Sequence, residues 1–341
     1  MCVDGISSYP VMKSNHAFKV RNLYPESGVK VPYQPVSYSE VYFREPESYS
    51  DQTRLNGIVN TSDSTGYYVD IFRSRKVEGG DKMHDYFYHN MGQVMTLKAA
   101  DGTDLDLQPT QELAFAGAHL YAYSYIYDKK SVLTDKNIKA EYTINMPDKN
   151  DITMNMWMKG EKDREVFSAL SPMTEGISRI KGMPYDIKKQ PTLTFVARQK
   201  GEAWTRPFVS IFEPVTKSSP SVIASVEYPS VVSDGQSGSD VAIKVNLKDG
   251  SQDLILSSDS NANVCSSENI QTKSSYSICR TKNGTPVLVF MGNGTYFKGA
   301  DIEIKSEKPT NVLVYREKGE WKYMSSDDAS IIICLLYTSD A

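Results

Sequence analysis

The side chains best suited to chemistry are concentrated in one stretch, Tyr67–Asn90, with the sequence YYVDIFRSRKVEGGDKMHDYFYHN. It contains two of the four histidines in the chain, four tyrosines and two arginines. Histidine, tyrosine and carboxylate groups transfer protons in general acid–base catalysis, and arginine forks bind carboxylates. Five residues therefore form either a ligand-contacting or a structural cluster: Asp70, Arg73, Arg75, His84 and His89.

The residues of this stretch alternate with the period of β-strands. Tyr67, Val69 and Ile71 alternate with polar and aromatic neighbours, and a second alternating run begins at His84. Between the runs, Ser74–Met83 is charged and contains a pair of glycines, as a turn would. The pattern predicts a β-hairpin.

The hairpin constrains what the five residues can do. His84 and His89 are five positions apart on one strand, so they fall on opposite faces and cannot share a metal ion without a bulge. Asp70 and His89 could meet across the hairpin, where a structural His–Asp pair is commoner than a two-ligand metal site. Arg73 and Arg75 share a face near the loop, as contacts for an acidic glycan or as ordinary solvated charges.

Composition excludes several classes of function. The 341 residues are 40% hydrophobic, which is enough for a packed core, and the formal net charge of −4 gives no basic face for nucleic acid or an anionic membrane. No transmembrane run is present, and the polar residues Asp4, Ser7 and Ser8 interrupt any signal peptide.

The four cysteines form no CxxC pair and no zinc-like spacing with histidine. Cys265 and Cys279 could close a disulfide, as in an oxidising compartment, or remain two buried or free thiols.

Strand-like runs continue along the whole chain, separated by loops rich in Asp, Asn, Gly and Pro. The sequence thus predicts a mainly β protein, with a large antiparallel β-sandwich at 1–230 and a smaller β domain at 231–329. Lys13–Val36 is predicted as a long connection, and Pro109–Ala118 as a short helix. Tyr121, Tyr123, Tyr125 and Tyr127 should form a tyrosine ladder on one strand, which either packs in the sandwich or lines a groove.

Further local predictions concern turns and the two ends of the chain. Asp4-Gly5 should turn between two short strands, and Lys282-Asn283-Gly284 and Gly292-Asn293-Gly294 have hairpin chemistry. The ending CLLYTSDA looks like translated sequencing-adapter read-through, so residues 330–341 are interpreted as a non-native tail; the alternative is a final hydrophobic strand.

Three segments together resemble the sandwich region of the heparinase II/III-like polysaccharide lyases. Val69–Asn90 is similar to a family strand with the pattern vDifR followed by an HDYfyHn strand. MCVDGISSYP at the start resembles a tVxVDG strand, and Arg198–Pro214 resembles later sandwich strands. The resemblance covers Met1 to about Pro229, and a supersandwich-like fold is what it implies.

The resemblance also implies a secreted or periplasmic enzyme that cleaves uronic-acid-containing polysaccharide by β-elimination. In that family an N-terminal α/α toroid supplies catalytic Asn, His and Tyr residues, and an HxH pair begins the sandwich. A divalent metal, zinc, is held there by one of those histidines, a later Asp and the His of a His-Asn pair. This sequence has neither the toroid nor an HxH motif. We therefore assign no catalytic residue, cofactor or metal ligand within it.

The expected function is that of a non-catalytic C-terminal portion of such a lyase, inactive alone. Its partners would be an acidic polysaccharide and the toroid domain of the same chain. Heparin, heparan sulfate, alginate and other uronate polymers all remain open as substrates. The alternatives are a stand-alone carbohydrate-binding or adhesive β module, and a complete small lyase with an unrecognised site.

Overall fold

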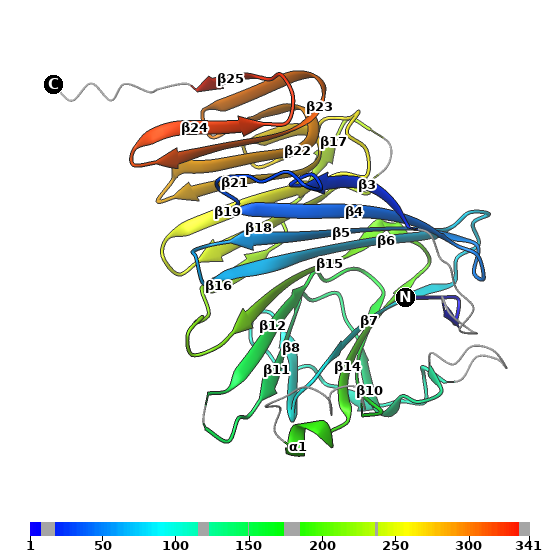
Figure 1. The fold of residues 1–341 in the computed structure, drawn as a ribbon. Coiled ribbons are helices and arrows are strands. Elements are labelled where there is room, and N and C mark those ends of the chain that lie inside the picture. Colours follow the sequence, from blue (N-terminus) through cyan, green and yellow to red (C-terminus); the bar gives the residue numbers. More distant parts are fainter. Residues whose placement is uncertain (8–17, 115–122, 149, 174–184, 236–237, 334–341) are drawn as a thin grey trace. The chain divides into compact units, whose positions relative to one another are not determined.

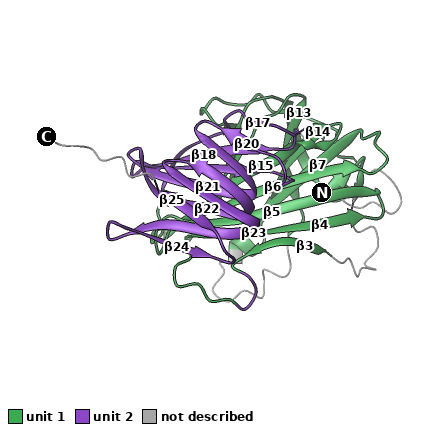
Figure 2. Ribbon diagram, turned by 90° about the horizontal axis from the view of Figure 1, so that it is seen from above, with its two compact units in different colours: residues 1–25, 29–221 green, residues 26–28, 222–341 purple. Residues whose placement is uncertain are grey.

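The computed structural model describes residues 1–7, 18–114, 123–148, 150–173, 185–235 and 238–333 (Figure 1). The chain divides into two compact units, coloured separately in Figure 2. Unit 1 comprises Met1–Pro25 and Val29–Ser221, and unit 2 comprises Glu26–Gly28 and Val222–Ala341. The division at Ser221–Val222 lies somewhat before the boundary at residue 230 that the sequence suggested.

Unit 1 contains two antiparallel sheets. The first is seven-stranded, in the order β2 (Ile6–Ser7), β1 (Cys2–Val3), β7 (Met83–Asn90), β14 (Thr192–Lys200), β13 (Arg164–Ser171), β10 (Tyr127–Leu133) and β9 (Gln108–Pro109). The second is eight-stranded, in the order β3 (Lys19–Tyr24), β4 (Val36–Glu45), β5 (Ser50–Asn60), β6 (Gly66–Lys76), β15 (Ala203–Val215), β12 (Ile152–Met158), β11 (Ile138–Ile144) and β8 (Val94–Ala99). The predicted antiparallel, mainly β fold is confirmed.

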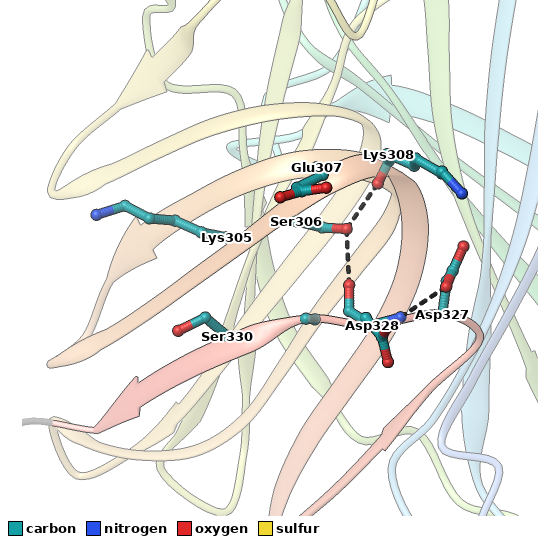
Figure 3. A pocket seen from close by; sticks show the side chains of 8 residues that line it. Lys305, Ser306, Glu307, Lys308, Asp327, Asp328 and Ser330 are labelled. Atoms are coloured by element: carbon teal, nitrogen blue, oxygen red, sulfur yellow. Dashed lines mark hydrogen bonds between the residues drawn. The ribbon is translucent and has the colours of Figure 1, made fainter.

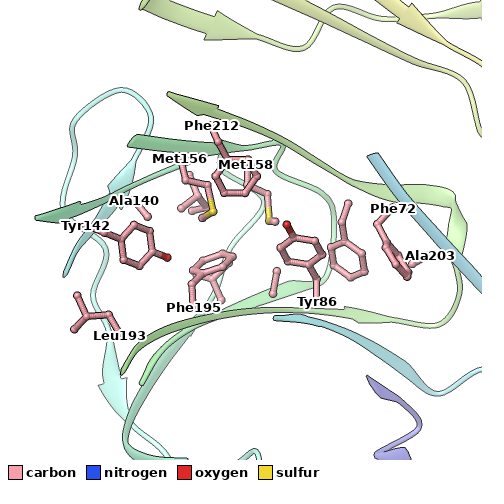
Figure 4. Packing of buried hydrophobic residues seen from close by; sticks show 14 residues of the cluster. Phe72, Tyr86, Ala140, Tyr142, Met156, Met158, Leu193, Phe195, Ala203 and Phe212 are labelled. Carbon is pink, nitrogen blue, oxygen red and sulfur yellow. The ribbon is translucent and has the colours of Figure 1, made fainter. Parts of the chain in front are cut away.

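A hydrophobic core joins the two sheets of unit 1 (Figure 4). Tyr86 and Phe195 enter it from the seven-stranded sheet, and Phe72, Met156 and Phe208 enter it from the eight-stranded sheet. Alternate residues of each strand point to opposite faces, so Tyr86 faces this core while its neighbour Phe87 packs on a smaller outer cluster. Burying each large side chain contributes roughly 1.5–3 kcal/mol, so this core contributes substantially to the stability of unit 1.

The predicted hairpin at Tyr67–Asn90 is wrong. β6 pairs with β5 and β15 in the eight-stranded sheet, whereas β7 pairs with β1 and β14 in the seven-stranded sheet. Residues 77–82 therefore carry the chain from one sheet to the other. Hairpins and sheet crossings both use alternating strands around a polar loop, so the local pattern could not distinguish them. Each strand instead gains two partners on other strands, and its inward face is buried against the other sheet.

Polar contacts fix the crossing between β6 and β7. The Lys76 backbone N–H donates to Asp81 Oδ1 at 2.7 Å. Asp4 Oδ1 accepts the backbone N–H groups of Lys82 at 2.8 Å and Met83 at 3.0 Å. Asp4 belongs to the predicted turn with Gly5, which is confirmed: both residues have positive φ, 52° and 83°, and β1 pairs with β2 on either side. The N-terminal turn thus anchors the crossing.

Several other local predictions differ from the structure. The segment predicted as a long connection contains strand β3, and β9 occupies the start of the predicted helix at Pro109–Ala118. Proline at β9 has no N–H to donate, which is tolerated because β9 is an edge strand. Residues 110–114 are not helical and 115–118 lie outside the described residues. A short helix, α1 (Tyr185–Lys188), lies elsewhere in unit 1.

The predicted tyrosine ladder is also wrong over its described part. Tyr123 and Tyr125 lie in a tight turn, and strand β10 begins only at Tyr127. Tyr123 is buried and packs in the outer cluster of the seven-stranded sheet, whereas Tyr125 is 62% exposed. Hydrogen bonding and packing of Tyr123 hold the turn against the strand propensity of the run. Tyr121 lies outside the described residues.

Unit 2 contains one antiparallel sheet. Its main order is β16 (Ile223–Glu227), β18 (Val241–Leu247), β19 (Ser251–Ser257), β21 (Ile270–Lys282), β22 (Thr285–Gly299), β23 (Ile302–Glu317) and β24 (Glu320–Ser325). Three short strands pair beside this path: β17 (Val232–Ser233), β20 (Cys265–Ser267) and β25 (Ser330–Ile333). β25 pairs with β23, so Ser330–Ile333 forms the alternative hydrophobic strand, while residues 334–341 lie outside the description.

The two predicted turns of unit 2 have different outcomes. Asn283 and Gly284 have positive φ, 49° and 79°, between β21 and β22, as a tight hairpin requires. Gly292-Asn293-Gly294 instead lies inside β22, where the pairing with β23 shifts register. A Cβ atom on Gly294 would lie 2.6 Å from the Ser274 Cβ, so glycine permits a bulge there.

Cys265 and Cys279 are free, buried thiols in the core of unit 2, so the disulfide alternative is wrong. Cys265 lies opposite Thr272 in the strand register, and Cys279 lies seven positions further along β21. Seven strand positions span roughly 23 Å, far beyond the separation that a disulfide allows. Burial raises the pKa of the Cys279 thiol to about 12. No helix among the described residues is long and apolar enough to cross a membrane.

We predict that Phe195→Ala lowers the free energy of unfolding of unit 1 by about 3–5 kcal/mol, because it empties the centre of the core between the sheets. The Phe195 side chain is fully buried, so the surrounding strands would have to move to fill the space. The matched control, Tyr125→Ala, removes an exposed ring and should change stability by less than about 0.5 kcal/mol. Urea unfolding followed by tryptophan fluorescence measures both, and equal effects would contradict the assigned core.

Candidate functional site

The structure separates the five predicted residues into distinct environments. Asp70 lies between the two sheets of unit 1 and is only 3% exposed. Arg54 of β5 binds it with both ends of its fork, Nε to Oδ1 at 2.9 Å and Nη2 to Oδ2 at 2.7 Å. Asn56 Nδ2 donates to Oδ1 at 3.2 Å, and the Tyr86 hydroxyl donates to Oδ2 at 2.7 Å. The Tyr86 bond comes from the opposite sheet.

This arrangement gives the Asp70 carboxylate a structural role. Both of its oxygens accept hydrogen bonds, one set of which forms a bidentate, charge-assisted pair with arginine. Burial, and then the charge of Asp70, raises the pKa of Tyr86 well above its ordinary value. Tyr86 therefore keeps its proton at neutral pH and donates it to Asp70 in a hydrogen bond. The predicted meeting of Asp70 with His89 does not occur, because His89 lies on the opposite face of β7 from Tyr86 and contacts Thr194 there.

Arg73 and Arg75 share one face of the eight-stranded sheet, as predicted from their spacing, but their surroundings differ. Arg73 is 1% exposed, so its description as a solvated charge is wrong. Its charge lowers the pKa of buried Glu40, although desolvation dominates and leaves that pKa raised. Arg75 is exposed, and its guanidinium carbon lies 4.3 Å from the centre of the Trp204 ring. Only Arg75 of the two can meet a ligand.

His84 connects β7 to the end of β6 and to the crossing. Its ring is fully buried, with Nε2 2.7 Å from Asp81 Oδ1 and Nδ1 2.9 Å from Ser74 Oγ. A carboxylate can only accept, so Nε2 carries the proton and Nδ1 accepts from the serine hydroxyl. Burial lowers the pKa of His84, while the nearby Asp81 opposes that effect. Both ring nitrogens are occupied by the fold.

His89 lies on the opposite face of β7 from His84, which confirms that prediction. Its Nδ1 is 3.0 Å from Thr194 Oγ1 on the neighbouring strand β14. Thr194 also contacts the Ser171 hydroxyl at 2.7 Å. The His89 ring stacks on Phe87 with centroids 6.0 Å apart, and burial lowers its pKa. His89 therefore belongs to the outer surface of the sandwich.

Among the residues that the structure describes, no three or more His, Cys, Asp and Glu side chains are grouped so that they could hold a metal ion. His84 and Asp81 form a two-residue pair, and Ser74 occupies the second nitrogen of His84. The zinc site that the family resemblance implies does not fit these residues, so no chemical step is derived through a metal.

A second buried network, which the sequence patterns did not reveal, surrounds Asp85. Arg198 of β14 binds it through Nε at 2.7 Å and Nη2 at 3.0 Å, and also contacts Glu112 through Nη1 at 3.0 Å. The Tyr123 hydroxyl donates to the same carboxylate. Asp85 lies in the HDYFYHN motif and Arg198 in Arg198–Pro214, so both segments were singled out from the sequence. Their pairing was not predicted, because 113 positions separate them.

Unit 2 has a polar pocket of about 580 Å³ beside the bend in β23 (Figure 3). The Ser306 Oγ lies 2.7 Å from the backbone oxygen of Lys308 and 2.9 Å from that of Asp328, so its single hydrogen is shared between the two walls of the pocket. Its charges are mixed, with three acids and two lysines. The lining residues are Lys305, Ser306, Glu307, Lys308, Asp327, Asp328, Ala329 and Ser330.

The chain was compared with known proteins. No protein-family model matches it. Over 281 residues, 80% of this chain, it is 29% identical to a protein described as an endo-acting ulvan lyase from Formosa agariphila. The match covers 33% of that protein, so the chain spans about a third of the length of this curated relative. The chain is thus a distant, partial homologue of a polysaccharide lyase.

We predict that Asp70→Ala lowers the free energy of unfolding by about 3 kcal/mol, because it removes the bond between the sheets and leaves Arg54 without its partner. This is the lower end of the cost for buried pairs, since the Arg54 side chain is 45% exposed. Tyr86→Phe should cost about 1.5–3 kcal/mol, because the lost hydrogen bond is to a charged carboxylate. Asp104→Ala, which breaks an exposed pair with Lys98, is the control and should cost less than about 1 kcal/mol. A loss at Asp70 no greater than at Asp104 would be inconsistent with the network.

His84 should make stability depend on pH. Burial holds the folded-state pKa of His84 below the ordinary value of about 6.5, so the unfolded chain binds more protons as pH falls below that value. Stability contributed by neutral His84 is therefore present above about pH 6.5 and is lost as pH falls toward the folded-state pKa. Chemical denaturation from about pH 7.5 to pH 5 should show a steeper loss for the wild type than for His84→Gln. Parallel profiles would show that His84 does not control this dependence.

Proposed function

We propose that this chain is the β-sandwich portion, with the following small β unit, of a polysaccharide lyase that cleaves uronate-containing polysaccharide by β-elimination. The observation that carries the proposal is the 29% identity to an endo-acting ulvan lyase across 80% of the chain. The two facing sheets of unit 1 agree with the sandwich of the heparinase II/III-like lyases, the family that the three sequence segments resemble. Ulvan is accordingly the first polysaccharide to test.

Within such an enzyme, the described residues act as support for chemistry that other parts perform. β-Elimination requires a base for the proton beside the uronate carboxylate, and groups that neutralise that carboxylate. Tyr86 and Tyr123 donate to buried carboxylates, and both have pKa values raised by burial. His84 has both nitrogens engaged. These proton carriers stabilise the sandwich instead of facing a substrate.

The proposal extends to partners and location. The remainder of the lyase, including an α/α toroid in the same polypeptide, would supply the base and the metal site. A polysaccharide polymer is too large and polar to cross a membrane unaided, so the protein would act in the periplasm or after secretion. An alternative role is a stand-alone carbohydrate-binding β module, which the exposed Arg75 guanidinium, held on the Trp204 ring, favours.

The test compares the 341-residue chain with a chimera in which it replaces the homologous third of the Formosa agariphila protein. Each is incubated with ulvan, alginate, heparin, heparan sulfate and chondroitin, and the ultraviolet absorbance of the unsaturated uronate product is followed. We expect cleavage of ulvan by the chimera and no turnover by the chain alone. Turnover by the chain alone would overturn its non-catalytic role. A folded but inactive chimera, with polysaccharide binding by the chain, would support the stand-alone module instead.

A further inference from the structure

One face of the eight-stranded sheet carries exposed cations on three of four neighbouring strands. Lys19 and Arg21 lie on β3, Arg44 on β4 and Arg75 on β6, and all four residues are exposed. We call these four residues the cationic stripe. It lies apart from Asp70, which points from the same sheet into the core between the two sheets.

Strand register places three of these cations in two adjacent rows, and Arg21 lies at a register shift in β3. Arg44 pairs with Asp51, and Asp51 pairs with Arg75, so one row crosses β4, β5 and β6. Lys19 pairs with Tyr42 in the next row, two positions away along β4. Side chains directly opposite on neighbouring strands lie about 5 Å apart on one face. Four strands span roughly 14 Å, which suits several linked sugars better than one.

Aromatic rings hold the three guanidinium groups of the stripe. The guanidinium carbon of Arg21 lies 5.0 Å from the Tyr42 ring centre, and that of Arg44 lies 5.7 Å from the Tyr49 ring centre. Arg75 stacks at 4.3 Å on Trp204. Stacked guanidinium groups lose less conformational freedom when they bind a carboxylate or sulfate, and their planar forks match such anions. The stripe is therefore preorganised for anionic ligands.

The charges of the stripe are only partly neutralised. Asp51 accepts from Arg44 Nε at 2.9 Å and from the Tyr42 hydroxyl at 2.5 Å. Arg21 reaches Glu40 at 3.6 Å, but Glu40 is buried and also interacts with Arg73.

Lys19 and Arg75 form no ion pair within the described part of the chain. Glu47 and Glu78 are exposed in the loops beyond this end of the sheet, so the positive excess is confined to the strand face.

We propose that the cationic stripe binds an acidic polysaccharide chain through its carboxylate or sulfate groups. The inference rests on the proposed function for its ligand class and deepens it by assigning a binding surface to unit 1. The rings of Tyr42 and Tyr49 beside cations on an extended sheet face offer sugars a stacking surface next to anion contacts. The whole chain carries a net charge of −4, so only the cationic stripe, and not the entire surface, should attract an anionic polymer.

The test measures the Kd of the 341-residue chain for ulvan, alginate and dextran sulfate, with neutral dextran for comparison, by affinity electrophoresis. Lys19→Gln/Arg75→Gln removes the two cations that form no described ion pair, so folding should be preserved; a thermal melt verifies this. The matched control, Lys98→Gln/Lys139→Gln, removes two lysines that lie opposite each other on β8 and β11, at the other edge of the same sheet. Lys139 Nζ also lies 5.5 Å from the Trp157 ring centre. Removing each cation of the stripe should weaken binding by a few-fold, giving about 5- to 10-fold for the stripe variant.

Wild-type binding should also weaken as salt rises, because the stripe would form exposed ion pairs with the polymer. The proposal is overturned if the wild type binds none of the three acidic polymers, if the stripe variant binds like the wild type, or if the control loses as much affinity. If the chimera cleaves ulvan but the stripe variant binds the acidic polymers as tightly as the wild type, the cationic stripe is not the binding surface and the proposed function still stands. If the stripe variant loses affinity for ulvan but the chimera is inactive, the cationic stripe is supported as a binding surface and the proposed lyase function is contradicted.

Discussion

The buried Asp70 carboxylate constrains how the two sheets of unit 1 face each other, because its hydrogen-bond partners come from both sheets. Tyr86 reaches from the seven-stranded sheet to a carboxylate that Arg54 and Asn56 already hold on the eight-stranded sheet. A buried carboxylate without such partners would be costly. The crossing between β6 and β7 must therefore place these two strands face to face, and Asp4 and Asp81 fix the loop that does so. Packing of Phe72, Phe195 and Phe208 then excludes water around the bond.

This constraint explains why a cluster of catalytic residue types need not be a catalytic site. Once the strands are in separate sheets, the proton-carrying side chains satisfy one another across the sandwich or along its ladders. His84 bonds to Asp81 and Ser74, and Asp85 binds Arg198. The cations of the stripe remain partly available, since Lys19 and Arg75 form no ion pair among the described residues. Support and recognition can thus occupy opposite faces of one sheet.

Sequence reasoning recovered features that depend on short-range physics. The Asp4-Gly5 and Asn283-Gly284 turns followed from residues that accept positive φ, and the opposite faces of His84 and His89 followed from the strand period. It failed where distant segments decide the outcome. The assignment of β6 and β7 to different sheets, the pairing of Asp85 with Arg198, and the burial of Arg73 all depend on strands far away in sequence. Tyr123 is a further case in which a distant segment decides the structure. The alternating tyrosines indicated a strand, but the hydrogen bond from Tyr123 to Asp85 holds a turn.

The most direct test of this account is a nuclear magnetic resonance titration of the chain with ulvan oligosaccharide, observing the Trp204 indole and the rings of His84 and His89. The account predicts that the Trp204 signal shifts, because Arg75 stacks on that ring at the cationic stripe, while the His84 signals do not change. A shifted His84 ring with an unperturbed Trp204 indole would contradict it, because the ligand would then reach the residues that we assign to the support of the fold.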